Sequence, residues 1–166
     1  MKRMLITVIS LFVLAGCGAR ETFETVDDVS VQPVIAPMQQ VQVSLPDEAA
    51  APAMEDGAGS KIYLCDGYTV TVQTFSGGDL DKTLQQATGF SRESLTLLET
   101  GHDGVTRYDC AWSTMGEGGN QVCRGVVLDD GRAHYVVCVM APESEAGAFR
   151  ETWQNILSSV TLVSTD

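Results

Sequence analysis

The stretch QVCRGVVLDDGRAHYVVCVMA, residues 121–141, contains two β-rich runs on either side of Asp130-Gly131. Valine, tyrosine and cysteine-rich runs of this kind favour strands, and an Asp-Gly dipeptide between them is typical of a two-residue hairpin turn. The upstream run VTRYDCAWSTM, residues 105–115, has the same character and is followed by the glycine-rich segment GEGGN. The sequence therefore predicts a three-stranded antiparallel meander.

Further strands are predicted before this meander. The runs KIYLC at residues 61–65 and YTVTVQTF at residues 68–75 flank Asp66-Gly67, which suits a two-residue turn with positive φ at both central positions. The run SLTLLET at residues 94–100 adds another strand, and His102-Asp103-Gly104 follows it as a polar turn. The expected sheet has about six antiparallel strands.

Two helices are predicted to pack on this sheet. Asp79 can cap a helix that Gly89 is placed to end, and apolar residues recur inside it at helical spacing: Leu80, Leu84 and Ala87. A second helix, beginning near Ser144, has a wide apolar stripe: Phe149, Trp153, Ile156, Leu157 and Val160. The fold class expected from these patterns is α+β.

The N-terminus has the features of an export signal. Met1-Lys2-Arg3 is basic, and residues 5–15 form an apolar run that is too short for a membrane span of about 20 residues. The ending LAGC, residues 14–17, resembles the lipobox of bacterial lipoproteins. This resemblance implies that residues 1–16 are a signal peptide and that Cys17 carries a diacylglycerol thioether. An ordinary secretory signal peptide with an incidental cysteine is the alternative.

The expected partner of Cys17 is the lipid bilayer. Two or three acyl chains, each contributing about 0.8 kcal/mol per buried methylene, make a stable anchor. Gly18 stands where an aspartate favours retention in the inner membrane of enteric bacteria, so the resemblance favours the outer membrane. The protein is expected in the bacterial cell envelope, with its domain in the periplasm or at the cell surface.

The mature chain divides by composition into two parts. Residues 17–60 contain four of the five prolines, one aromatic residue, eight acidic residues and one basic residue. Such a segment buries little apolar surface, so it predicts a disordered stalk that ends where a globular domain of residues 61–166 begins. Residues 29–45 are more apolar than a spacer requires, and docking of this segment on its own domain or on a partner is the alternative to a solvated linker.

Four cysteines besides Cys17 predict two disulfides in an exported chain. Two-residue turns in the meander would place Cys123 opposite both Cys110 and Cys138, of which it can bond only one. We favour Cys110 with Cys123 and Cys65 with Cys138, because Cys123 and Cys138 would fall in the wider hydrogen-bonded type of pair. Neither the spacing of the cysteines nor that of the histidines predicts a metal site.

Several functional classes are disfavoured by the sequence. A net charge of −12 repels nucleic acid. The two histidines, His102 and His134, are expected to be structural or solvated, Asp129 and Asp130 are expected to be turn residues, and no nucleophile or nucleotide-binding motif occurs. We therefore predict no catalytic residue and no cofactor.

Two family resemblances bear on function. The strand GYTVTV at residues 67–72, the short helix after it and the segment from residue 133 to 162 resemble the PsbP-like fold, which implies a non-catalytic binding or scaffold role. YLCDGYTVTV at residues 63–72 and GVTRYDCAW at residues 104–112 are similar to segments of membrane-bound c-type lysozyme inhibitors. The function expected is binding of another envelope component; the alternatives are inhibition of a basic lytic enzyme and, third, binding of a small molecule.

Overall fold

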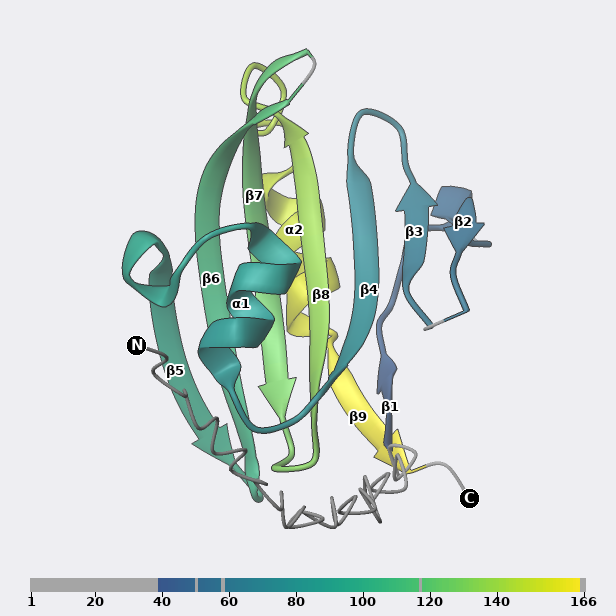
Figure 1. Ribbon diagram of the computed structural model, residues 1–166. Coiled ribbons are helices and arrows are strands. Elements are labelled where there is room, and N and C mark those ends of the chain that lie inside the picture. The colour runs from purple at the N-terminus through teal and green to yellow at the C-terminus, as the bar shows by residue number, and fades with distance from the viewer. Residues whose placement is uncertain (1–38, 50, 58, 117, 165–166) are drawn as a thin grey trace, which may run out of the picture. The chain divides into compact units, whose positions relative to one another are not determined.

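A computed structural model describes residues 39–49, 51–57, 59–116 and 118–164. Its largest element is a seven-stranded sheet in the order β2-β3-β4-β8-β7-β6-β5, in which every neighbouring pair is antiparallel (Figure 1). The strands are β2 (Met54–Glu55), β3 (Lys61–Leu64), β4 (Thr69–Ser76), β5 (Thr96–His102), β6 (Val105–Gly116), β7 (Gly119–Asp129) and β8 (Ala133–Pro142). The predicted α+β class is confirmed, with β2 as an additional strand.

The remaining elements are short. They are β1 (Gln39–Gln42), the 3₁₀ turns η1 (Asp47–Ala49) and η2 (Arg92–Ser94), the helices α1 (Leu80–Thr88) and α2 (Arg150–Ser158), and β9 (Thr161–Ser164). β1 and β9 pair as a separate two-stranded antiparallel ribbon. None of the helices in the described ranges is long and apolar enough to cross a membrane.

The two helices cover opposite faces of the large sheet (Figure 1). Leu84 of α1 belongs to one buried cluster with Val127 and Val136, whereas Trp153 of α2 belongs to another with Val126 and Val137. Neighbouring residues of a strand point to opposite faces, so each of β7 and β8 contributes to both clusters. We call the two sides of the sheet the α1 face and the α2 face.

The predicted start and end of α1 are confirmed. The Asp79 side chain accepts a hydrogen bond from the Lys82 backbone N–H at 3.2 Å, and Gly89 ends the helix with φ 81°. A side chain at Gly77, just before the helix, would lie 2.5 Å from the backbone carbonyl carbon of Arg132, so only glycine fits there. The predicted start of α2 near Ser144 is wrong, because residues 143–149 form turns and the helix begins at Arg150.

The predicted boundary between stalk and domain is also wrong. β1, η1 and β2 all lie within the segment assigned to the stalk, and Val41, Val43 and Leu45 pack against the cluster beneath α2. These three residues alternate along an extended chain, so they turn one apolar side toward the domain. The alternative of docking on the chain's own domain therefore holds for residues 39–45. The signal peptide and Cys17 lie outside the described residues.

Candidate functional site

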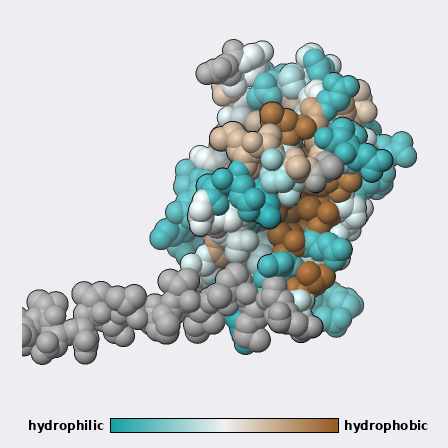
Figure 2. Space-filling view, turned by 90° about the vertical axis from the view of Figure 1, so that its right-hand side faces the viewer, coloured by the Kyte–Doolittle hydropathy of each residue, from teal (hydrophilic) through white to brown (hydrophobic). Residues whose placement is uncertain are grey.

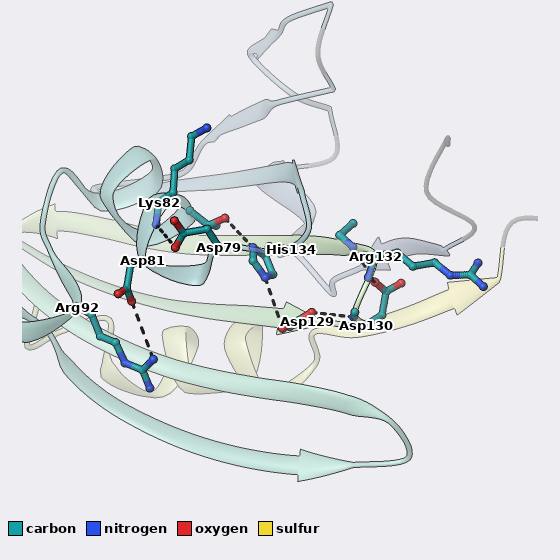
Figure 3. Close-up of polar contacts among 11 residues, drawn as sticks. Asp79, Asp81, Lys82, Arg92, Asp129, Asp130, Arg132 and His134 are labelled. Carbon is teal, nitrogen blue, oxygen red and sulfur yellow. Dashed lines mark hydrogen bonds and ion pairs between the residues drawn. The ribbon is translucent and has the colours of Figure 1, made fainter. Parts of the chain in front are cut away.

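A buried polar cluster joins α1 to the sheet around His134 (Figure 3). His134 lies on β8 and is fully buried, and its Nδ1 atom is 2.6 Å from the Oγ1 atom of Thr83 on α1. Its Nε2 atom is 3.5 Å from Oδ2 of Asp129, at the limit of a hydrogen bond. The side chains thus occur in the order hydroxyl, imidazole, carboxylate.

This order is found in nucleophilic catalysis, but the burial of the cluster opposes that role. Thr83 is 3% exposed and His134 is 0% exposed, so neither the hydroxyl nor the imidazole can meet a substrate. The contact instead fastens α1 to β8. The interpretation of His134 as a structural residue agrees with this geometry.

The two acidic residues beside His134 are held by the turn between β7 and β8. Asp130 Oδ1 accepts hydrogen bonds from the backbone N–H groups of Arg132 at 2.9 Å and Ala133 at 2.8 Å, and Asp129 Oδ1 accepts one from Gly131 at 2.7 Å. Burial alone would raise the pKa of Asp130, but these N–H groups and the Tyr135 hydroxyl outweigh it and lower that pKa. Both carboxylates therefore act as turn residues, as predicted.

His102, unlike the buried His134, is exposed to solvent. Its side chain is 88% exposed, and its Nδ1 atom is 2.9 Å from Oδ2 of Asp103. Asp103 and Gly104 both have positive φ and form the polar turn that the sequence predicted between β5 and β6. A histidine so exposed has the solvated role expected for it.

The registers behind the predicted disulfides are wrong by two residues. Cys123 lies opposite Trp112 and Met140, whereas Cys110 and Cys138 both lie opposite Gly125. In the turn after β7, Asp130 and Ala133 flank the two central residues, Gly131 and Arg132. The Asp130 carboxylate holds this arrangement by accepting a hydrogen bond from the Ala133 backbone N–H. Asp130-Gly131 is therefore not the central pair of the turn.

The four described cysteines are free thiols in this structure. The sulfurs of Cys110 and Cys138 lean over Gly125, whose missing side chain leaves them room: a Cβ atom there would lie 3.2 Å and 3.0 Å from them. Cys65 packs with the cluster on the α2 face and Cys138 with the one on the α1 face, so the predicted bond between them would have to cross the sheet. Cys110 and Cys123 share a face but are diagonal neighbours, a spacing that exceeds the reach of an unstrained disulfide.

Burial makes three of these thiols weak acids. Desolvation raises the pKa of Cys110 to about 12 and that of Cys123 to about 11, and it raises the pKa of Cys138 further. Within the described ranges, no group of three or more histidine, cysteine or acidic side chains is arranged to hold a metal ion. These cysteines act as small apolar core residues.

The α1 face is only partly covered, and its uncovered part is the candidate binding surface. Directly opposed residues across the strands share a face, so Trp112, Cys123, Met140, Thr69 and Leu64 form one row from β6 to β3. Ile62 and Met54 continue the adjacent row onto β2. We define the open strip by its larger apolar side chains: Met54, Ile62, Leu64, Trp112 and Met140.

The open strip exposes large hydrophobic side chains to solvent. Met54 is 66% exposed, Leu64 is 63% exposed and Met140 is 38% exposed. In Figure 1, α1 lies in front of β6 to β8 and does not extend over β3. Figure 2 views the side of the domain where β2 and β3 lie and shows hydrophobic surface there between hydrophilic residues. Exposed apolar side chains grouped on one face are typical of an interaction site, and methionine adapts its shape to a partner.

A small cleft lies on the other side of the sheet, between α2 and the segment that follows β1. It is lined by Ser44, Leu45, Pro46, Glu48, Thr152, Asn155 and Ile156. Its polar groups are a single carboxylate, hydroxyls and an amide on a shallow surface, which is less than a small-molecule site usually provides. The sequence had indicated neither this cleft nor the open strip.

Comparisons with known proteins give no family. No family model matches the sequence, and no curated protein matches it. Among solved structures, the fold is similar to a protein of Bacteroides thetaiotaomicron, with 15% identity and a TM-score of 0.48 over 76% of this chain and 45% of that one. This chain thus spans less than half the length of that protein.

A second similar structure is LpqN of Mycobacterium tuberculosis, which is described as involved in cell envelope biogenesis. The identity is 14% and the TM-score is 0.43, over 75% of this chain and 84% of LpqN. At these values neither similarity assigns a function to this protein.

Proposed function

We propose that this protein is a non-catalytic, lipid-anchored protein of the bacterial envelope whose α+β domain binds another envelope component through the open strip. The observation on which the proposal depends is the strip itself: Leu64 and Met54 are each more than 60% exposed on a sheet face whose other half is buried by α1. Leaving such side chains in water costs about 1.5 to 3 kcal/mol each relative to burial, which a bound partner would recover.

The absence of a catalytic role is supported by the placement of the reactive groups. The hydroxyl and imidazole of the His134 cluster are buried, and Asp129 and Asp130 are engaged in a turn. His102 is exposed and contacts Asp103 in a surface turn. The lipid anchor is supported by the lipobox-like LAGC sequence that ends at Cys17.

The anchor is tested by metabolic labelling with palmitate. The wild-type chain should incorporate the label and fractionate with membranes, and the Cys17→Ser variant should do neither. Equal labelling of the two chains would remove the anchor from the proposal and leave only an exported binding domain.

The binding surface is tested by photo-crosslinking in cells. A photoreactive amino acid at Leu64 or Met140 should give a discrete adduct with one partner. The same residue at Met115, which is 77% exposed on the α2 face, should give none. In addition, Leu64→Glu should abolish the adduct formed from position 140. Adducts of equal yield from positions 64, 115 and 140 would contradict binding at the open strip.

Inhibition of a basic lytic enzyme is the second candidate. It is favoured by the net charge of −12 and by the resemblance of residues 63–72 to the lysozyme inhibitors. A lysozyme assay separates the two candidates, because full lysozyme activity in the presence of equimolar protein would eliminate the inhibitor.

A further inference from the structure

β5 is the open edge of the sheet and differs from the opposite edge. Among the residues that the structure describes, it pairs with β6 alone, and it is seven residues long, whereas β2 at the other edge has two (Figure 1). All of its residues are exposed except Leu97, which is half-buried. Natural sheets usually protect such an edge with lysine, proline or a bulge, but β5 contains neither residue type and its pairing with β6 is unbroken.

The turn after β5 fixes which of its backbone groups point outward. His102 lies opposite Val105, and the two residues between them have φ values of 50° and 79°, as in a type I′ turn. The residues that flank such a turn form a hydrogen-bonded pair, and the pairs alternate along the strands. The N–H and C=O groups of Leu97, Glu99 and Gly101 therefore point away from β6 and toward the open edge.

The residues around Leu98 read nearly the same in both directions along an antiparallel pair: Thr96, Leu97, Leu98, Glu99, Thr100. We propose that β5 pairs with β5 of a second copy of this chain about a two-fold axis at Leu98. Leu98 then lies opposite Leu98 of the second copy, and each Thr96 lies opposite Thr100. The outward backbone N–H and C=O groups of Leu97 in one copy then form hydrogen bonds with those of Glu99 in the other copy. The backbone hydrogen bonds and the side-chain contacts therefore require the same register.

The side-chain contacts suit this register. Leu98 is 63% exposed and has no covering helix on its side of β5 in the described ranges, so pairing buries one leucine against its copy. It occupies a non-hydrogen-bonded pair, in which the Cα atoms approach to about 4.5 Å and the side chains are closest. Threonine pairs on either side add favourable cross-strand contacts.

The charge of this edge permits self-association although the chain as a whole is acidic. Within Thr96–Thr100 the one ionised side chain is Glu99, and its Oε2 atom is 3.6 Å from Nη2 of Arg92. Two such Arg–Glu pairs would meet at the axis, where each arginine faces a second carboxylate. The segment therefore presents both a guanidinium and a carboxylate to its copy.

The size of the contact predicts a weak dimer. A five-residue edge pair buries less than the roughly 800 Å² per partner of a stable interface. Association should therefore be concentration-dependent and should be measured at high protein concentration. The chain from residue 18 onward, which retains every described residue, is suitable because it lacks the signal peptide and Cys17, and the result is then independent of the proposed anchor and of the open strip.

Cysteine cross-linking tests the register directly, in a Cys65→Ser background that removes the half-exposed thiol. Leu98→Cys should form a disulfide-linked dimer under mild oxidation, because the paired Cα atoms lie within disulfide range. Thr100→Cys alone should not, whereas a mixture of Thr96→Cys and Thr100→Cys chains should form the mixed dimer. Met115→Cys, exposed on the same face at the end of β6, is the control for random collision.

Sedimentation equilibrium provides the second measurement. Leu98→Lys places two positive charges opposite one another and should weaken association by about tenfold, whereas Met115→Lys should leave it unchanged. Cross-linking at position 98 no faster than at position 115 would overturn the proposal. Efficient dimerisation of Thr100→Cys alone, or an unchanged dissociation constant in Leu98→Lys, would overturn it equally.

Discussion

Replacement of Thr83 by valine should destabilise the domain through the buried contact between α1 and the sheet. Valine has nearly the same shape as threonine but lacks the hydroxyl that lies 2.6 Å from Nδ1 of His134. The ring would lose this partner at a site with no exposure, while its Nε2 atom keeps only the marginal 3.5 Å contact with Asp129. Leaving a buried polar atom unpaired costs about 1 to 3 kcal/mol, and the extra methyl of valine returns less than 1 kcal/mol.

Urea unfolding measures this cost as a lower midpoint with an unchanged slope. Thr83→Ser keeps the hydroxyl and loses only a methyl, so it should be more stable than Thr83→Val. His134→Phe combined with Thr83→Val should cost less than the sum of the two single changes, because no polar atom is then left alone. If Thr83→Val unfolds at the same urea concentration as the wild type, or if the two changes add, the hydrogen bond does not hold α1 in place.

The remaining predictions concern glycine, pH and the thiols. Gly77→Ala should lower the free energy of unfolding by about 1 to 3 kcal/mol, because its Cβ would lie 2.5 Å from backbone, whereas Gly101→Ala, with open space around it, should be nearly neutral in the same urea assay. The buried thiols should contribute their whole stabilisation to the free energy of unfolding below the ordinary thiol pKa of 9.0. The free energy of unfolding should then fall as the pH rises toward 11 to 12. The reason is that the unfolded chain releases thiol protons in this pH range, whereas folded Cys110 and Cys123 retain theirs. Cys123→Ala should make the fall in the free energy of unfolding less steep. An equally steep fall in that variant would contradict the prediction. In the chain from residue 18 onward, maleimide should label Cys65 alone in the folded state and all four cysteines in urea. A loss of labelling in urea without reductant would instead indicate disulfides.

Local sequence patterns predicted the elements better than their pairing. The capping of α1 by Asp79 and its ending at Gly89 depend on a few adjacent residues, so the sequence was sufficient there. The register of β7 and β8 depends on how the side chain of Asp130 holds the turn, and a shift of the turn by one residue moves each cysteine two places relative to its partner. The turn between β6 and β7 is displaced in the same way, so Cys123 lies opposite Trp112 and not opposite Cys110. The predicted bond between Cys65 and Cys138 fails because these two residues pack on opposite faces of the sheet.

The boundary at residue 60 failed for a different reason. Composition averages over a segment, and the prolines and acidic residues of the predicted stalk concealed a short alternating run of valine and leucine. Val41, Val43 and Leu45 need no more than that alternation to pack beneath α2, and β9 supplies the backbone hydrogen bonds for β1. A window of a few residues, tested for period two, would have found this strand.

The open strip exists because α1 is shorter than the strands that it covers, and the sequence analysis did not compare these lengths. The nine residues of α1 extend about 13 Å at 1.5 Å per residue, whereas the ten residues of β8 extend about 33 Å. A single helix of that length cannot bury a strand of that length. The uncovered part of β8 includes Met140, which lies in the same row across the sheet as Leu64 and Trp112. A polar row at that position would need no cover. Burial of an apolar row gains free energy, so this row is the surface on which a partner gains most by binding.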